Sequence, residues 1–280
     1  MGPQGVSVGV WKGVRSNRIH FNIGTMIEFL QIPLLKDNYS VIVRDASASW
    51  TLVVDPADAD PLQAALDERG WPLTHILNTH WHGDHVGGNL KLKARYGAKI
   101  FGAAASGEII PGLDQDVWHL SELIVGETRI EVHQVSGHTP HHVAYGFPEQ
   151  KILFAGDTLF GLGCGRLLGG TAEALWASLD RIRKLPPDTL IYCAHEYTES
   201  NARFAASVEP LNEALADRRQ AIASLRQKGR PTVPFTLAGE LAANPFLRPE
   251  SPEIRAHLGM GETDSNSEVF RRLRQLKDTY

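Results

Sequence analysis

The stretch Thr79-His80-Trp81-His82-Gly83-Asp84-His85 places three imidazoles and one carboxylate within six residues. A helix brings only residues three or four apart onto one face, so His80 and His82 point together only in a loop or at a strand end. Residues 74–79 suit a strand, and residues 84–96 suit a helix after a glycine-softened turn. The sequence therefore predicts a metal site in a strand-to-helix loop, where α/β proteins often carry functional groups. The alternative is a polar loop that happens to be rich in histidine.

The composition is that of a globular protein: 280 residues, of which 42% are hydrophobic and 21% charged. No apolar run approaches the roughly 18 residues of a membrane span. A net charge of −4 gives no general attraction to nucleic acid. The two cysteines, Cys164 and Cys193, fit neither a metal finger nor a disulfide scaffold, which favours a reducing compartment. These observations favour a cytoplasmic protein without a nucleic-acid or membrane partner. We expect a monomer, although composition does not determine the oligomeric state.

Residues 1–25 differ from the rest, because Lys12, Arg15 and Arg18 occur there with no acid before Glu28. The segment suits a weak organelle-type presequence, or an upstream extension of a protein whose natural start is Met26. The second interpretation fits better because the segment has few Arg and Ser residues and little amphipathic pattern. We expect a disordered extension with no part in the chemistry.

From residue 26 to residue 198, short β-rich runs alternate with turns and a few helices, and after residue 199 helical periodicity takes over. Strands are expected at 40–43, 51–54, 99–101, 129–133, 143–147, 151–154 and 189–192, and further helices at 60–69 and 172–184. The C-terminal part carries two apolar stripes, namely Leu211, Leu215, Ile222 and Leu225, and then Val269, Phe270, Leu273 and Leu276. The Pro-rich connector 229–252 is expected to be irregular but packed. The pattern predicts a mixed sheet protein with a helical appendage.

Three later side chains of metal-binding type each follow a β-like run: His138, Asp157 and His195. Strands of one sheet that each end in such a residue would converge at one rim. Alternatives remain, because His141 and His142 lie near His138 and one of these three histidines could cap a backbone group, while Asp157 also suits a turn or helix cap. The complete candidate set is His80, His82, Asp84, His85, His138, Asp157 and His195. Six terminal ligands and one bridging carboxylate would complete a two-metal centre, and such N and O donors suit zinc, iron or manganese.

Further motifs allow a family to be identified: Gly156-Asp157-Thr158-Leu159-Phe160, Gly163-Cys164-Gly165-Arg166, Cys193 to Thr198, Asn244 to Arg248, Gly261 to Asp264 and Arg274 to Asp278. With the His-x-His-x-Asp-His run, residues 26–280 resemble the metallo-β-lactamase superfamily and, within it, the hydroxyacylglutathione hydrolase (glyoxalase II) family. The resemblance implies an α+β fold, a four-layer αββα sandwich with a C-terminal helical domain. It implies a catalytic domain at 26–198 and a glutathione-binding helical domain at 199–280.

The resemblance also implies roles for individual residues. One metal is expected on His80, His82 and His138, the other on Asp84, His85 and His195, with Asp157 bridging. The glutathione moiety is expected to contact Arg166, Tyr197, Arg274 and Lys277. Leu168 stands where some members have Tyr, so one hydroxyl contact is missing.

The residues of the last helix support this assignment independently of the family. Ser265 and Glu268 suit a capping box at its start. Arg274 and Lys277 lie three residues apart on one face, where a basic pair suits a dicarboxylate ligand. The alternative interpretation is a solvated basic surface.

The implied activity is that of a thiolester hydrolase. Its reaction would be hydrolysis of S-D-lactoylglutathione to D-lactate and glutathione by a hydroxide bound to two divalent metals, with zinc expected first, in the second step of methylglyoxal detoxification. Asp84 would also orient the hydroxide, whereas Cys164 lacks a neighbouring base and is not expected to act as a nucleophile. The alternatives are a persulfide dioxygenase, another hydrolase of the superfamily such as a β-lactamase or lactonase, and a non-catalytic binding scaffold with a structural metal.

Overall fold

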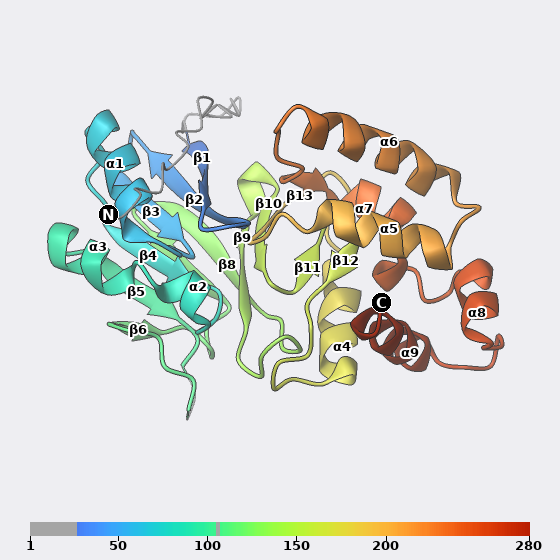
Figure 1. The fold of residues 1–280 in the computed structure, drawn as a ribbon. Helices are drawn as coiled ribbons and strands as arrows, with labels where there is room; N and C mark the ends of the chain where they lie inside the picture. The colour runs from blue at the N-terminus through green and yellow to red at the C-terminus, as the bar shows by residue number, and fades with distance from the viewer. Residues whose placement is uncertain (1–26, 105–106) are drawn as a thin grey trace, which may run out of the picture.

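The computed structural model of the protein describes residues 27–104 and 107–280, so the expected extension at 1–25 lies outside the described residues. Two β-sheets pack against each other between helical layers (Figure 1). Helices α1 (Ala59–Arg69) and α3 (Asn89–Tyr96) flank the first sheet. Helix α4 (Ala172–Ile182) and the C-terminal helices flank the second sheet. The predicted α+β sandwich with a C-terminal helical region is confirmed.

The first sheet has the strand order β1-β2-β3-β4-β5-β6 and the second the order β14-β13-β10-β9-β8-β7, while β11 and β12 form a separate pair. The strands of the first sheet are β1 (Ile27–Leu34), β2 (Asn38–Asp45), β3 (Trp50–Val54), β4 (His75–Asn78), β5 (Lys99–Gly102) and β6 (Gln115–Asp116). The others are β7 (Glu122–Val125), β8 (Thr128–Gln134), β9 (Val143–Phe147), β10 (Ile152–Gly156), β11 (Leu159–Phe160), β12 (Gly163–Cys164), β13 (Leu190–Cys193) and β14 (Phe235–Thr236).

Strand direction brings the candidate ligands to one rim. β3 pairs in parallel with β4, so Asp55 and the histidine-rich loop both follow strand ends on the same side of the first sheet. In the second sheet β10 pairs in parallel with β13, so Asp157 and His195 emerge side by side. β8 is antiparallel to β9, which is antiparallel to β10, so the chain leaving β8 towards His138 runs to that same end.

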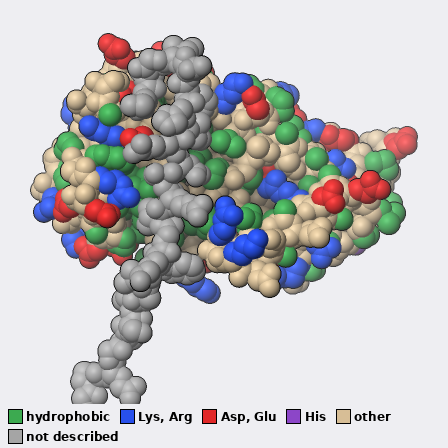
Figure 2. All heavy atoms as spheres, turned by 90° about the horizontal axis from the view of Figure 1, so that it is seen from above, with side chains coloured by type: hydrophobic (Ala, Val, Ile, Leu, Met, Phe, Trp, Pro, Cys, Tyr) green, Lys and Arg blue, Asp and Glu red, His purple; other side chains and the backbone are tan. Residues whose placement is uncertain are grey.

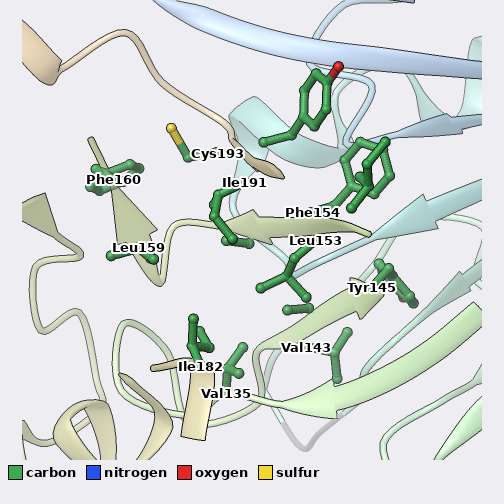
Figure 3. Packing of buried hydrophobic residues seen from close by; sticks show 14 of the residues in the cluster. Val135, Val143, Tyr145, Leu153, Phe154, Leu159, Phe160, Ile182, Ile191 and Cys193 are labelled. Carbon is green, nitrogen blue, oxygen red and sulfur yellow. The ribbon is translucent and has the colours of Figure 1, made fainter. Parts of the chain in front are cut away.

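One large apolar core joins the two sheets and continues into the C-terminal helices. It contains side chains of the first sheet such as Phe29, of the second sheet such as Phe154, and of the last helix such as Phe270. Figure 3 shows part of this packing, where Val143 and Leu153 come from neighbouring strands of the second sheet. The helices at 198–208 and 266–278 have a fixed position beside the rim that carries the ligands, because they bury apolar side chains such as Phe204 and Phe270 in this core. The helix at 213–227 packs through Leu215 and Ile222 in a separate, smaller cluster.

The remaining helices are α2 (Gly83–Val86), α5 (Thr198–Val208), α6 (Glu213–Gln227), α7 (Leu237–Ala243), α8 (Pro252–Leu258) and α9 (Asn266–Asp278), with 3₁₀ turns η1 (Pro148–Gln150) and η2 (Pro245–Leu247). Among the described helices, none is long and apolar enough to cross a bilayer. Figure 2 shows acidic and basic side chains interspersed on the face seen from above.

Several predicted elements differ from the structure. All eight predicted strands, with that at 74–79 included, overlap observed ones, but elements such as β1 and α5 had no prediction. The connector 229–252 is packed as expected, since Phe246 is 1% exposed, but it is not irregular, because it forms β14, α7 and η2. Leu211 was wrongly assigned to an apolar stripe: it precedes α6 and is 83% exposed.

Candidate metal centre

The histidine-rich loop begins where β4 ends and is held by Asp55, a buried residue directly after β3. The Asp55 carboxylate accepts hydrogen bonds from the backbone N–H of Thr79 at 2.7 Å and from its hydroxyl at 2.7 Å. The same carboxylate accepts from Nδ1 of His85 at 3.0 Å. One side chain therefore fixes both ends of the loop, and buried charge-assisted bonds of this kind are strong.

The helix predicted over 84–96 is broken into α2 and α3 at Gly87 and Gly88. A Cβ atom on Gly87 would lie 2.5 Å from the carbonyl oxygen of Ala57. The N–H of Gly88 donates to the carbonyl of Pro56 at 2.7 Å. This close approach requires glycine, and it separates the single turn that carries Asp84 and His85 from the rest of the helix.

The first ligand group consists of His80, His82 and His138, whose donor atoms all lie within 4.8 Å of one another. Nδ1 of His82 lies 2.9 Å from Nε2 of His80 and 3.1 Å from Nε2 of His138. Burial lowers the pKa of all three imidazoles, most strongly for His80. The rings are therefore neutral at pH 7 and each keeps a lone pair for a cation.

The second group consists of Asp84, His85 and His195. Oδ2 of Asp84 lies 3.4 Å from Nε2 of His195 and 3.9 Å from Nε2 of His85. Burial raises the pKa of Asp84, but the neighbouring His85 and a hydrogen bond of 3.1 Å from the Asn38 amide outweigh it, so the pKa is lowered overall. The carboxylate is therefore ionised and available as a ligand.

Asp157 lies between the two groups. Its Oδ1 is 3.5 Å from Nε2 of His85 and 3.4 Å from Nε2 of His195, while its Oδ2 is 3.5 Å from Nε2 of His138. A third set of donor atoms, from His80, His85 and Asp157, also lies within 4.8 Å. Each carboxylate oxygen thus faces a different group, which is the arrangement that a bridging carboxylate needs.

Hydrogen bonds at Nδ1 orient three of the imidazoles so that Nε2 faces the shared space. His138 donates to the carbonyl of Arg166 at 2.8 Å, and Nδ1 of His195 lies 3.0 Å from Oδ1 of Asp37. His85 is held in the same way by Asp55. Such partners fix the tautomer of a metal-binding histidine. Sequence reasoning missed Asp37 and Asp55. Asp55 directly follows the predicted strand 51–54, so the signal that pointed to Asp157 could have found it, whereas Asp37 lies in a turn, where aspartate is common.

The donor atoms fit a cation better than they fit one another. Nε2 of His85 and Oδ1 of Asp157 are both buried without a hydrogen-bond partner. Burial lowers the pKa of His195 but the Asp157 carboxylate, with Asp37 and Asp84, raises it to about 9. Buried polar atoms without a partner are costly. An arrangement that points several of them at one space is therefore compatible with metal ions that would bind them.

The structure also gives the environments of the residues that were alternatives to these ligands or to a metal-bound nucleophile. Nε2 of His142 accepts a hydrogen bond from the backbone N–H of Asp157 at 3.1 Å, so this histidine is the one that caps a backbone group. Nδ1 of His141 lies 3.2 Å from the Glu108 carboxylate. Burial raises the pKa of the Cys164 thiol to about 11, which agrees with its rejection as a nucleophile.

The four predicted substrate contacts lie in different environments. The ring of Tyr197 stacks on His195, with centroids 4.7 Å apart and planes 3° apart. The Arg166 side chain is exposed, although its backbone carbonyl holds His138. Nζ of Lys277 lies 4.9 Å above the ring of Phe204.

Arg274 is only 3% exposed, so the alternative of a solvated basic surface is wrong for this residue. Its guanidinium donates to the carbonyl of Cys164 at 3.1 Å and to that of Gly165 at 3.4 Å. It also pairs with Asp278 at 2.9 Å. Arg274 therefore fastens α9 to the loop that leads to Arg166. Leu168 is 52% exposed.

Comparison with known proteins agrees with this geometry. Residues 37–195 match the family model of the metallo-beta-lactamase superfamily, and residues 196–280 match that of the hydroxyacylglutathione hydrolase C-terminus. A protein of Methylococcus capsulatus named hydroxyacylglutathione hydrolase is 51% identical over 91% of this chain and 99% of its own length.

Two solved structures share the fold. The crystal structure of ETHE1 from Myxococcus xanthus has a TM-score of 0.62 and 24% identity, and covers 88% of this chain and 89% of its own. That of TTHA1623 in a di-iron-bound form has a TM-score of 0.56 and 25% identity, and covers 78% of this chain and 99% of its own. Together with the family models that span both parts of the chain, these comparisons show that the chain belongs to the hydroxyacylglutathione hydrolase family of the metallo-β-lactamase superfamily.

Proposed function

We propose that the protein hydrolyses the thioester S-D-lactoylglutathione to D-lactate and glutathione, and that seven side chains hold two divalent metal ions for this reaction. The observation that carries the proposal is the position of Asp157, with one carboxylate oxygen facing each ligand group. The Methylococcus relative bears the name of this activity along nearly its whole length. The di-iron form of TTHA1623 supports two ions rather than one.

His80, His82 and His138 would hold one ion, and Asp84, His85 and His195 the other, with Asp157 shared. When bound, two such ions would lower the pKa of a water molecule towards roughly 7 and polarise the thioester carbonyl. Zinc is proposed first because the donors are nitrogen and oxygen atoms, and iron or manganese would accept the same set.

Asp84 is the most open carboxylate of the centre, since its side chain is 42% exposed against 11% for Asp157. We assign it the role of orienting the attacking water by accepting a hydrogen bond from it. The departing glutathione thiolate has a conjugate acid of pKa about 8.5, so it can leave without a proton donor.

The glutathione part of the substrate would lie along Tyr197, Arg166 and Lys277. Tyr197 is fixed against a metal ligand, so its hydroxyl has a defined position at the edge of the centre. Arg166 and Lys277 form no ion pair with any described residue and offer their charges to the carboxylates of glutathione. Arg274 would act with them by holding the Arg166 loop as well as by its charge.

We propose that the chain is divided into two domains. Residues 26–198 form the catalytic domain and residues 199–280 the glutathione-binding domain. The protein would act as a monomer in the cytoplasm, in the disposal of methylglyoxal. None of these assignments changes the chemistry of the centre.

The proposal is tested by comparing two thioesters of lactate, one with glutathione and one with N-acetylcysteamine, which carries no carboxylate. We expect a much higher kcat/KM for the glutathione thioester, because only it reaches Arg166 and Lys277. Equal values would show that the basic residues do not bind substrate. Oxygen consumption with glutathione persulfide, or faster hydrolysis of a lactone, would favour the rival enzymes of the superfamily. Metal binding without any turnover would favour a scaffold.

A further inference from the structure

The carboxylate of Glu196 joins segments that are far apart in the sequence. Its side chain is 6% exposed. It accepts hydrogen bonds from the hydroxyl of Tyr39 at 2.8 Å, and from the N–H and hydroxyl of Thr232 at 2.8 and 2.5 Å. Nη1 of Arg226 lies 3.4 Å away. Tyr39 belongs to β2, Arg226 to α6 and Thr232 to the segment before β14, so one carboxylate ties the first sheet to the C-terminal region.

The backbone of Glu196 is also fastened to the turn between β1 and β2. Its N–H donates to the carbonyl of Asp37 at 2.9 Å. The Asp37 side chain lies 3.0 Å from Nδ1 of His195, and the neighbouring Asn38 donates to Oδ2 of Asp84 at 3.1 Å. The turn thus contacts two of the three members of the second ligand group. The contacts of Asp37 and Asn38 with the ligand side chains are all to this group.

The donors around Glu196 depend on its charge. Burial and the neighbouring Glu196 carboxylate raise the pKa of Tyr39, so its hydroxyl remains a donor. Without an anionic acceptor, this hydroxyl and the N–H of Thr232 would remain in a largely buried space without a full partner, which is unfavourable. The network would then relax, and β2 would no longer be held against the segment that carries His195.

We propose that Glu196 is a positioning residue that couples the C-terminal helical region to the second ligand group. It holds the β1–β2 turn in place, so that Asp37 and Asn38 orient His195 and Asp84 for a metal ion. The first ligand group is held by Asp55 and by the carbonyl of Arg166 and does not depend on this turn. The inference rests on the proposed role of these side chains as metal ligands.

The test is a titration of metal-free protein with Co²⁺, followed by calorimetry and by the visible absorption of the bound ion, on the wild type and on Glu196→Gln. Glutamine keeps the size of the side chain but loses the charge. We expect one of the two Co²⁺ affinities of the variant to equal that of the wild type. The other, which belongs to the ion held by Asp84, His85 and His195, should be about 10- to 100-fold weaker, the usual effect of losing a residue that orients a ligand.

Glu209→Gln is the matched control. Glu209 is also a buried carboxylate with several partners, accepting from Arg248 at 2.8 Å, Ser251 at 2.6 Å and Asn212 at 3.0 Å. All these partners lie in the C-terminal region, so this variant should lose thermal stability while both Co²⁺ affinities stay unchanged. Tyr39→Phe removes a single donor and should weaken only the second Co²⁺ affinity, by less than Glu196→Gln, which keeps the test open if the latter fails to fold.

Two results would overturn the inference while leaving the proposed function intact. The first is that Glu196→Gln or Tyr39→Phe binds both ions as the wild type does. The second is that both affinities fall equally, because a general loss of folding would do that. A wild type that binds fewer than two ions would instead refute the two-metal centre and this inference with it.

Discussion

The charge of Lys277 gives the proposed glutathione site a pH dependence. Burial, followed by the nearby charges of Arg274, Arg203 and Arg166, lowers the pKa of Lys277 to about 8. A lysine with that pKa is about 90% protonated at pH 7 and about 10% at pH 9. If only the ammonium form binds a substrate carboxylate, the apparent KM should rise about tenfold over this range. The value of kcat should not follow this titration, since Lys277 does not touch the ligand groups.

The assay is the initial rate of S-D-lactoylglutathione hydrolysis at saturating metal, fitted for KM and kcat at half-unit steps of pH. Lys277→Arg is the control, because arginine stays charged throughout and the substrate titrates equally with both proteins. The variant should have a KM that is nearly flat from pH 7 to pH 9. A wild-type KM that is equally flat, or a rise that persists in Lys277→Arg, would refute the assignment of Lys277.

The lowered pKa of Lys277 also affects the stability of the fold. The pKa in the folded protein lies below that of an unfolded lysine, about 10.4. Between pH 8 and that value the unfolded chain binds more protons, so this residue makes the free energy of unfolding rise with pH. Below pH 8 both states are protonated and its destabilising effect is fully present.

Three further predictions concern the centre and its supports. Asp55→Asn should weaken metal binding about 10- to 100-fold, whereas Asp45→Asn, which alters an equally buried carboxylate at the end of β2, should lower stability alone; equal metal affinities of the two variants by calorimetry would contradict this. His82→Ala and Asp157→Ala should each lose metal and turnover together, and elemental analysis showing two ions with full activity would reject the ligand set. Arg274→Ala should mainly raise KM and also lower the melting temperature, since its buried bonds to the 164–165 backbone are lost; an unchanged KM would leave it a purely structural residue.

The sequence was most informative where chemistry and local structure coincide. The loop at 79–85 could be placed between a strand and a helix because closely spaced histidines exclude a continuous helix. His138, Asp157 and His195 could be linked to it because each follows a strand signal, and strand direction then brings them to one rim. The structure places all seven candidate ligands together in this way.

The features that sequence reasoning missed depend on contacts between distant residues. Gly87 breaks the predicted helix because the backbone of Ala57 lies against it, and no local pattern records that neighbour. Arg274 looks like a surface cation in its helix, yet it is buried because the loop at 164–165 accepts its hydrogen bonds. Leu211 fits a helical spacing but precedes the helix, so periodicity alone misplaced it. Tertiary packing decided each of these cases.

The central claim is that two metal ions on these seven side chains serve the hydrolysis of a glutathione thioester. It is tested most directly by following the loss of thioester absorbance of S-D-lactoylglutathione with the purified protein and determining metal content on the same sample. The account predicts rapid turnover with about two ions per chain, and parallel loss of ions and turnover upon chelation. Full loading with two ions and no hydrolysis of this thioester would contradict it.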